Sequence, residues 1–421
     1  MTGPNSSKSD NTINNPTAKL RFPEFLGSSP WSRKVGGELF TNRKEVGEEG
    51  LPIYSVTVND GMVPRASFDR DFYDIADSAC NRKAYKGDIV YNMMRMWQGA
   101  QGVAPEDCMV SPAYVVLKPR KEVCAEFFAY FFKLPQSLQV LTATSRGLTK
   151  DRLRLYFDDF ARMRMSAPDH NEQRRIASCL ASMDELILAE GQKLDALKDH
   201  KKGLMQQLFP REGETLPRLR LPEFQNAGDW ERKPLAELVE VASGQVDPKE
   251  EPYCRLLHVG GENIESRTGD LQNLKSARED AVISGKYLFD ETYVLYSKIR
   301  PALNKVAVPT FSGVCSADIY PIRPSSSELI RAHLLYLLRS ESFVTYAVRN
   351  SERGKIPKIN REALLAYFAS VPKPAEQQRI AACLSSLDDL IASQANRIQA
   401  LRTHKQGLMQ QLFPSPVNVF S

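Results

Sequence analysis

The side chains that most often catalyse reactions or bind metals are few in this sequence and are scattered. Five histidines and seven cysteines are spread over 421 residues. No two cysteines have the CxxC spacing, and no group of cysteines and histidines has the spacing of a zinc site. Glu231-Arg232-Lys233 has the Glu-x-Lys order of some nucleases, but no acidic partner precedes it at nuclease spacing. We therefore expect no catalytic residue, no cofactor-binding residue and no metal site in this chain.

Sequence motifs for binding nucleotides or transferring methyl groups are also missing. Gly285-Lys286 and Gly354-Lys355 both lack the upstream glycine and the following Ser or Thr of a phosphate-binding loop. No GxGxxG follows a predicted strand, and no Asn/Asp-Pro-Pro-aromatic tetrapeptide, the catalytic loop of amino-methyltransferases, is present. The sequence favours a protein that binds and organises other molecules over an enzyme.

Two nearly identical stretches organise the chain. Residues 172–210 are EQRRIASCLASMDELILAEGQKLDALKDHKKGLMQQLFP, and residues 376–414 are EQQRIAACLSSLDDLIASQANRIQALRTHKQGLMQQLFP, at a constant offset of 376 − 172 = 204. Neither has an internal proline, and both are rich in residues that favour helices. Their apolar residues are spaced by three and four, which is typical of a coiled coil. We predict two long helices that pair antiparallel. The seam positions are Ile176, Leu180, Met183, Ile187, Leu194, Leu197, Leu204 and Leu208, then Ile380, Leu384, Leu387, Ile391, Ile398, Leu401, Leu408 and Leu412.

Four polar residues interrupt this seam: Glu190, Lys201, Gln394 and Lys405. A buried unpaired charge is costly, so polar seam residues mainly select the register of a helix pair. The register that brings them together sets Glu190 against Lys405 and Lys201 against Gln394. The alternative is that each helix packs on a globular domain of its own.

A second repeat precedes each long helix. Residues 20–25 are LRFPEF, followed by Trp31, and residues 219–224 are LRLPEF, followed by Trp230, at an offset of 219 − 20 = 199. We expect these large aromatic residues to be packing anchors. A repeat of about 200 residues indicates a duplicated domain. Between the repeats the sequences diverge, and we expect strands within 87–92, 113–117, 293–297 and 318–322 and helices at 125–133 and 332–338.

The predicted fold class is α+β, with two globular domains separated by two long helices that form an antiparallel coiled coil, and with a pseudo-twofold internal repeat. The expected divisions are a disordered tail at 1–19, a first globular domain at 20–168, a first helix at 169–210, a linker at 211–218, a second globular domain at 219–372, a second helix at 373–414 and a tail at 415–421.

Composition indicates the cellular compartment but does not decide the function. The formal net charge is +5 and the pI is about 8.7, which permits nucleic-acid binding but does not require it. The odd, scattered cysteines argue against a disulfide framework. No apolar run reaches membrane-spanning length, and the N-terminus lacks a signal-peptide core. We expect a protein of the reducing cytoplasm.

Two divergent domains on a duplicated framework suit the recognition of two different halves of one DNA target, because DNA has local twofold symmetry. The chain resembles, along most of its length, the specificity (S) subunit of a Type I restriction-modification system. The likeness is carried by PDHNEQRRI at 168–176 and PKPAEQQRI at 372–380, by GLMQQLFP at 203–210 and 407–414, and by each LRxPEF with its tryptophan. Singly these motifs are weak, but in this order, twice, they are specific.

The resemblance implies two target-recognition domains that bind double-stranded DNA and do no chemistry. Two modification subunits would bind S-adenosylmethionine and methylate adenine, with the base flipped out of the stack. Restriction and translocation subunits would bring ATP and Mg²⁺. The long helices would set the spacer between half-sites and dock the modification subunits. The non-seam residues considered for docking are Arg175, Gln206, Gln207, Arg379, Gln410 and Gln411.

Base and phosphate contacts need Arg, Lys, Asn or Gln side chains in the divergent domains. The candidates in the first domain are Asn92, Arg95, Gln98, Arg146 and Lys150, and those in the second are Lys298, Arg300, Asn304, Lys305, Arg353, Lys355 and Lys358. The alternative for each is a solvated surface side chain. The alternative for the whole chain is a structural adaptor that binds proteins through two paralogous domains, whose binding would not weaken steeply with salt.

Overall fold

A computed structural model describes residues 18–68, 78–351 and 356–414. The chain divides into two compact units, unit 1 (Met1–Gly191 with Arg397–Ser421) and unit 2 (Gln192–Asn396). Each unit contains one half of each long helix, whereas the divisions drawn from the sequence gave each helix a segment of its own. Residues 1–17 and 415–421 of the predicted tails lie outside the described residues. Within the described part of the chain, no helix is both long enough and apolar enough to cross a membrane.

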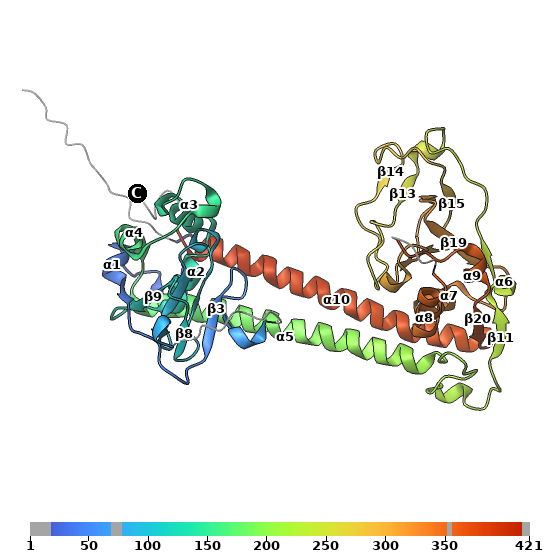
Figure 1. Ribbon diagram of the computed structural model, residues 1–421, viewed down its shortest axis with the longest axis horizontal. Helices are drawn as coiled ribbons and strands as arrows, with labels where there is room; N and C mark the ends of the chain where they lie inside the picture. The colour runs from blue at the N-terminus through green and yellow to red at the C-terminus, as the bar shows by residue number, and fades with distance from the viewer. Residues whose placement is uncertain (1–17, 69–77, 352–355, 415–421) are drawn as a thin grey trace, which may run out of the picture. The chain divides into compact units, whose positions relative to one another are not determined.

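Unit 1 contains three small sheets (Figure 1). Its strands are β1 (Ser32–Val35), β2 (Phe40–Arg43), β3 (Ile53–Val56), β4 (Met62–Pro64), β5 (Arg82–Ala84), β6 (Ile89–Asn92), β7 (Gln101–Val103), β8 (Cys108–Val110), β9 (Tyr114–Pro119) and β10 (Arg164–Ala167). Its shorter helices are α1 (Gly36–Leu39), α2 (Ala125–Phe131), α3 (Pro135–Thr144) and α4 (Phe157–Arg162). The sheet β2-β9-β6-β7 is antiparallel, β4-β3-β8-β5 has one parallel pair, β3 with β8, and β1 pairs with β10.

Unit 2 repeats this plan strand for strand. Its strands are β11 (Glu231–Pro234), β12 (Val239–Val241), β13 (Leu257–Val259), β14 (Lys275–Ser276), β15 (Tyr287–Phe289), β16 (Val294–Ser297), β17 (Val306–Ala307), β18 (Gly313–Cys315), β19 (Ile319–Pro324) and β20 (Phe368–Val371). Its shorter helices are α6 (Leu235–Leu238), α7 (Arg331–Arg339), α8 (Glu341–Arg349) and α9 (Arg361–Leu365). The sheets are β12-β19-β16-β17, β14-β13-β18-β15 and β11-β20, and the parallel pair is β13 with β18. The predicted internal repeat is confirmed, and the strands and helices expected from the sequence are β6, β9, β16, β19, α2 and α7.

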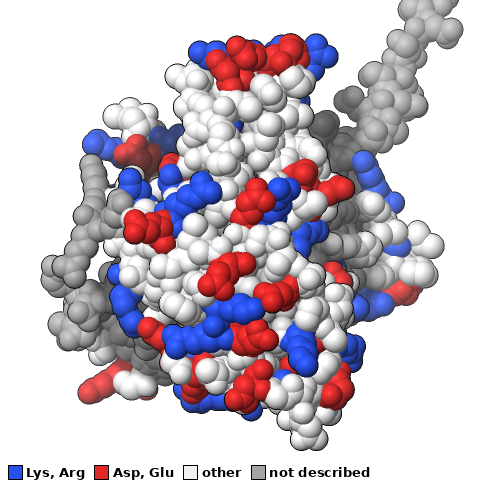
Figure 2. Space-filling view, turned by 90° about the vertical axis from the view of Figure 1, so that its right-hand side faces the viewer, with Lys and Arg blue, Asp and Glu red and all other residues white. Residues whose placement is uncertain are grey.

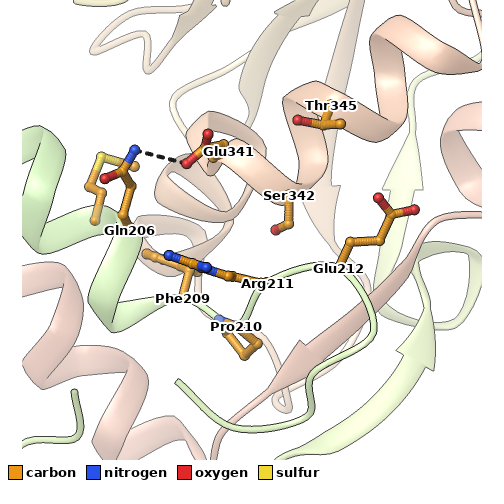
Figure 3. A pocket seen from close by; sticks show the side chains of 9 residues that line it. Gln206, Phe209, Pro210, Arg211, Glu212, Glu341, Ser342 and Thr345 are labelled. Atoms are coloured by element: carbon orange, nitrogen blue, oxygen red, sulfur yellow. Dashed lines mark hydrogen bonds between the residues drawn. The ribbon is translucent and has the colours of Figure 1, made fainter. Parts of the chain in front are cut away.

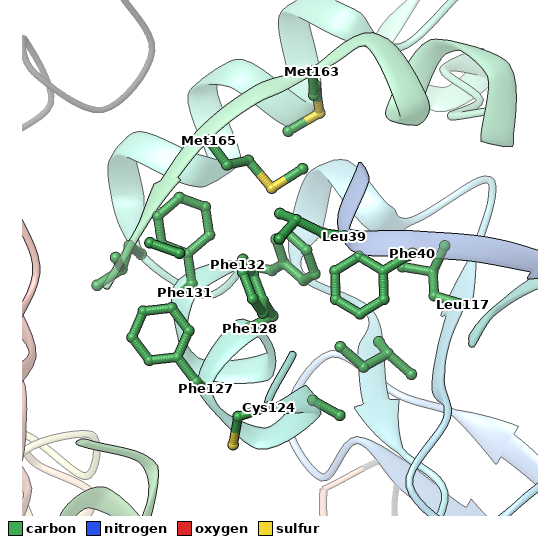
Figure 4. Close-up of a cluster of buried hydrophobic side chains, with 14 of the residues drawn as sticks. Leu39, Phe40, Leu117, Cys124, Phe127, Phe128, Phe131, Phe132, Met163 and Met165 are labelled. Carbon is green, nitrogen blue, oxygen red and sulfur yellow. The ribbon is translucent and has the colours of Figure 1, made fainter. Parts of the chain in front are cut away.

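An aromatic cluster forms the core of unit 1 (Figure 4). The sequence of α2, AEFFAYF, is apolar on nearly all sides, so the helix is buried and not amphipathic. Phe127, Phe128 and Phe131 have no exposed surface, and Phe128 packs edge-on against Phe40 of β2 with ring centroids 5.2 Å apart. The equivalent helix of unit 2, α7, is also buried, but it places His333 where α2 has Phe127.

The long helices are α5 (His170–Leu208) and α10 (Pro374–Leu412), each of 39 residues. Every predicted seam residue is buried or half-buried. In unit 1, Asp184 pairs with Lys405 at 2.5 Å and Glu190 pairs with Arg397 at 2.8 Å, so α10 runs backward as α5 runs forward. The helices are therefore antiparallel, and the alternative in which each packs only on its own domain is wrong. The end of α10 packs in the core of unit 1 together with the start of α5.

The register predicted from the four polar seam residues is wrong by close to one heptad. The partner of Lys405 is Asp184, six residues before the predicted Glu190, and the partner of Lys201 is Asp388, six residues before the predicted Gln394. The physical reason is that both lysines lie along the seam but place their ammonium groups at its edge. Asp184 and Asp388 are 47% and 35% exposed there, so neither ion pair is fully desolvated.

The repeated motifs fasten each unit to the first turn of a long helix. The guanidinium of Arg21 donates to Glu172 of α5, with Nε 2.9 Å from the carboxylate, and Arg220 donates to Glu376 of α10 at 2.8 Å. Both glutamates are almost completely buried. Trp31 and Trp230 are buried as predicted; Trp31 contacts Phe413 at the end of the α10 repeat.

Candidate nucleic-acid interface

In unit 1, two surface loops that carry predicted DNA-binding residues lie against each other. The first follows β6 and contains Arg95 and Gln98, and the second is a hairpin closed by Arg146 and Arg154, which exchange two backbone hydrogen bonds of 2.9 and 2.8 Å. The backbone N–H of Leu155 donates to the carbonyl of Met93 at 2.9 Å and joins the two loops. The fold thus brings together side chains that are about 50 residues apart in the sequence.

The structure separates the five candidates of unit 1 by what their side chains contact. Asn92 is 8% exposed, and its Oδ1 accepts a hydrogen bond from the N–H of Met94 at 3.0 Å, so it shapes the loop. Arg146 forms an ion pair with Asp159, which raises the pKa of its guanidinium. Arg95, Gln98 and Lys150 are exposed and form no ion pair or side-chain hydrogen bond with any described residue.

Unit 2 joins the equivalent loops in the same way. The loop after β16 contains Arg300, whose N–H donates to the carbonyl of Pro357 at 2.8 Å. The N–H of Ile359 donates to the carbonyl of Lys298 at 3.0 Å, which matches the Leu155–Met93 bond of unit 1. Lys358 is exposed on the second of these loops. Arg353 and Lys355 lie outside the described residues.

Most of the other candidates of unit 2 have partners inside the unit. Lys298 donates to the carbonyl of Ala317 at 2.9 Å, Asn304 to that of Arg339 at 3.1 Å, and Lys305 to that of Gly261 at 2.6 Å.

Arg300 differs, because its side chain is exposed and its backbone is left-handed at φ +49°, directly before Pro301. A non-glycine residue in this conformation stores about 1–3 kcal/mol of strain and is frequent at functional sites.

Sequence reasoning missed two basic side chains of the unit 1 hairpin, Arg152 and Arg154. Both are exposed, whereas Leu153 and Leu155 between and after them are buried. This alternation is visible in the sequence as Arg-Leu-Arg-Leu and is the signal that predicts one buried and one exposed face. With Lys150, these arginines make the hairpin basic.

A matched ion-pair cluster connects each unit's buried helix to the long helices. In unit 1, the hydroxyl of Tyr130 donates to Asp184 at 2.7 Å, and Lys405 lies over the Tyr130 ring. In unit 2, the counterparts are Tyr336, Asp388 and Lys201, with 2.8 Å from the hydroxyl to the carboxylate. Burial lowers the pKa of Lys201, and the ion pair with Asp388 opposes this shift. The clusters therefore connect α2 and α7 to residues of both long helices.

The docking residues considered on the long helices are partly engaged within the chain. Arg175 pairs with Glu24 at 3.1 Å, and Arg379 pairs with Glu223 at 2.9 Å, each through the glutamate of an LRxPEF motif. Gln206 donates to Glu341 at 2.9 Å at the edge of a pocket in unit 2 (Figure 3). The pocket is lined by Met205, Gln206, Phe209, Pro210, Arg211, Glu212, Glu341, Ser342 and Thr345. None of these nine side chains is a histidine, cysteine or lysine that could activate Ser342.

Charge is intermingled on the face of the molecule that Figure 2 shows, where Lys and Arg alternate with Asp and Glu. Unit 2 pairs many of its exposed charges, for example Arg349 with Glu212 at 2.6 Å and Lys233 with Glu328 at 2.9 Å. Paired charges attract phosphates weakly. Attraction for a polyanion therefore has to come from local groups of unpaired cations, and the joined loops of unit 1 carry such a group in Arg95 and Lys150.

Comparison with known proteins gives a consistent result. The family model for the Type I restriction modification DNA specificity domain matches residues 227–403. Over 199 residues the chain is 33% identical to the specificity subunit of the Type I restriction enzyme EcoDI from Escherichia coli. The aligned residues make up 46% of this chain and 43% of that subunit. The chain thus matches less than half of this relative. Over 371 residues it is 22% identical to the MjaVIII specificity subunit of Methanocaldococcus jannaschii, covering 79% of this chain and 81% of the relative.

Two solved structures share the fold. A chain from a study of the assembly and conformational transition of a type I restriction-modification system matches with a TM-score of 0.57 at 17% identity, covering 92% of this chain and 98% of that one. The S subunit of a Type I system from M. genitalium matches with a TM-score of 0.57 at 14% identity, covering 95% and 99%.

Proposed function

We propose that the chain is a Type I restriction-modification specificity subunit, in keeping with its matches, and that it recognises one double-stranded DNA site made of two unlike halves. Unit 1 binds one half and unit 2 binds the other. The protein adaptor considered from the sequence is not supported by the comparisons, whose matches are to DNA specificity subunits.

One observation carries this proposal: the two units share their framework and differ in their surface loops. Both have the same strand order, the same Arg–Glu pair at the helix start and the same Tyr–Asp–Lys cluster. The loops at equivalent positions share one arginine, Arg95 or Arg300, and differ around it: the loop after β6 is MMRMWQ at residues 93–98, and the loop after β16 is KIRPAL at residues 298–303. A duplicated framework with unlike loops is what recognition of two different sequences requires.

The exposed candidates then divide by chemistry. Gln98 and the arginines Arg95 and Arg300 have the hydrogen-bonding geometry to contact base edges, because Gln pairs with adenine and Arg with guanine. Lys150 and Lys358 are suited to phosphates, which lysine binds as a point charge. Arg353 and Lys355 remain candidates by sequence alone. The remaining candidates, Asn92, Arg146, Lys298, Asn304 and Lys305, hold the loops in shape through their partners inside each unit.

The reaction itself is assigned to partners. We propose that the chain is non-catalytic and that two modification subunits dock on the long helices, which also set the spacer between the half-sites. These subunits bind S-adenosylmethionine and methylate adenine, and restriction subunits supply ATP and Mg²⁺ chemistry. The proposed location is the cytoplasm, in keeping with seven free thiols.

Methylation mapping tests the proposal. The chain is expressed with its modification subunit in a methylation-free host, and methyladenine is located by single-molecule sequencing. The expected result is a single split motif with two unlike halves around a gap of fixed length. A strain without this chain is the control and should show no methylated motif. An assembled complex that binds S-adenosylmethionine but leaves DNA unmethylated would favour the protein adaptor.

A further inference from the structure

Leu148 is the most exposed large apolar side chain of the described residues, at 97%. It stands at the tip of the hairpin closed by Arg146 and Arg154 in unit 1. The other leucines of this segment, Leu153 and Leu155, are buried at 9% and 0% exposure. Because its side chain is almost fully exposed, Leu148 contributes nothing to the packing of unit 1. Exposure of an apolar side chain to water is unfavourable. The side chain of Leu148 is free for contact with another molecule.

The hairpin holds Leu148 in a defined place. Arg146 and Arg154 exchange two backbone hydrogen bonds, and the guanidinium of Arg146 is paired with Asp159 of α4. Gly147 lies so close to the opposite side of the loop that a Cβ there would be 2.6 Å from the carbonyl oxygen of Arg152. The base of the hairpin is bonded to the loop after β6 through Leu155. A fixed tip loses little conformational entropy when it enters a partner.

Cations surround this apolar tip. Lys150, Arg152 and Arg154 are exposed, and Asp151 is the acidic residue among residues 146–154. Arg95 is exposed on the loop bonded to the hairpin. A surface that docks on a protein places a larger apolar patch inside a polar rim, whereas here a single leucine projects from a basic loop. Proteins that kink DNA combine such cations with one leucine, isoleucine, methionine, phenylalanine or proline that enters a base step.

We propose that Leu148 is a wedge that enters between two stacked base pairs of the half-site bound by unit 1, while the cations of the hairpin hold the phosphates on either side. The proposal rests on the proposed function and deepens it, since the wedge makes the deformability of one base step part of the recognised sequence. Pyrimidine–purine steps unstack most easily, so the step that Leu148 enters is a TA or CA/TG step.

The experiment uses the full chain in complex with its modification subunits and a duplex that contains the mapped site. The adenine analogue 2-aminopurine, which fluoresces when unstacked, replaces one base at a time within the half-site of unit 1. The methylated adenine itself is left out, because its extrusion by the modification subunit would give the same signal. Wild type is compared with Leu148→Ala, with Leu148→Met, which keeps an apolar side chain of similar reach, and with Leu26→Ala, a leucine of unit 1 that is 70% exposed and lies outside the joined loops.

We expect a several-fold rise in emission at one step with wild type, Leu148→Met and Leu26→Ala, and loss of that rise with Leu148→Ala. Leu148→Ala also weakens binding of the mapped site about tenfold. Its slope of log Kd against log salt stays unchanged, because leucine carries no charge, whereas Lys150→Ala reduces the slope by about one.

Other outcomes overturn the wedge in different ways. If wild type binds and methylates its split site without a Leu148-dependent rise in emission, the wedge is wrong and the proposed function stands. If Leu148→Ala keeps the rise but no longer assembles with the modification subunits, Leu148 is a protein contact. If wild type does not distinguish the mapped site from scrambled DNA, the wedge and the proposed function are wrong together.

Discussion

Replacing His333 by phenylalanine should remove a pH dependence from the stability of unit 2. Burial lowers the pKa of His333 from 6.5 to about 3, because the imidazole has no exposed surface and neither ring nitrogen has a hydrogen-bond partner among the described residues. The ring is stacked on Phe209 with centroids 5.2 Å apart. The equivalent residue of unit 1, Phe127, lies 5.2 Å from Phe413, so the fold accepts phenylalanine at this position.

The sign and size of the effect follow from proton linkage. The unfolded chain protonates His333 below about pH 6.5, whereas the folded chain keeps it neutral down to about pH 3. Stability from the neutral ring is therefore fully present above pH 6.5 and is lost as the pH falls toward 3. At pH 5 the loss is about 2 kcal/mol, from roughly 1.4 kcal/mol per pH unit below the unfolded value.

Urea unfolding at pH 8 and pH 5 measures this loss. With a slope of about 2 kcal/mol per molar urea, the midpoint of unit 2 should fall by about 1 M in wild type beyond the change in His333→Phe. Hydrogen exchange in α7 locates the effect within unit 2. The matched control is His404→Gln, since His404 is exposed. If His333→Phe and wild type lose equal stability between the two pH values, the buried neutral imidazole is not the cause.

Three further substitutions test the framework and the interface. Glu376→Ala should cost about 3–5 kcal/mol in the free energy of unfolding, because it removes the buried partner of Arg220, whose side chain is only 13% exposed, whereas exposed Glu223→Ala should cost less than about 1 kcal/mol. Thermal unfolding compares the two, and equal costs would contradict the burial argument. Asp388→Asn should destabilise unit 2 by about 1–2 kcal/mol, seen as faster hydrogen exchange in α7, since Lys201 would stay buried without its ion pair; unchanged exchange would show that the pair contributes nothing. Arg300→Ala should weaken binding of the mapped DNA site more than of scrambled DNA if it contacts a base, whereas an equal loss identifies a phosphate contact and no loss contradicts the assignment.

The framework of two domains and two long helices could be predicted because its motifs occur twice in the sequence. Each repeated motif makes the same contacts in both units. The arginine of LRxPEF donates to the glutamate in the first turn of a long helix. The glutamine that follows this glutamate, Gln173 or Gln377, accepts a hydrogen bond from a backbone N–H at the start of α2 or α7. Because the residues that make these contacts occur in both copies, the order of domains and helices could be predicted from the sequence alone.

The helix register could not be predicted from the seam alone. Pairing Glu190 with Lys405 assumes that polar seam residues need each other. In the structure Lys405 instead lies over the ring of Tyr130 and reaches Asp184 at the seam's edge. Tyr130 belongs to the globular part of unit 1, so the position of Lys405 depends on tertiary packing and not on the helical repeat.

The sequence indicated which candidate loops lie together, but not which of their side chains are exposed. Both loops chosen in each unit lie together, because a backbone hydrogen bond joins them. Composition gave no way to tell Arg95, which is exposed, from Lys305, whose ammonium group is bonded to the carbonyl of Gly261. Both are basic residues on loops that follow a strand. Only the path of the backbone decides which of them has a carbonyl oxygen within reach.

The two units also show why framework and recognition can change independently. Trp31 and Phe413 hold the end of one long helix in the core of unit 1. The joined loops contribute Met96 and Leu155 to the same core but leave Arg95 and Lys150 exposed. A substitution at Arg95 or Lys150 removes no packing, because both side chains are exposed. The exposed positions of these loops can vary in sequence at little cost in stability, whereas Glu172 and Glu376 cannot.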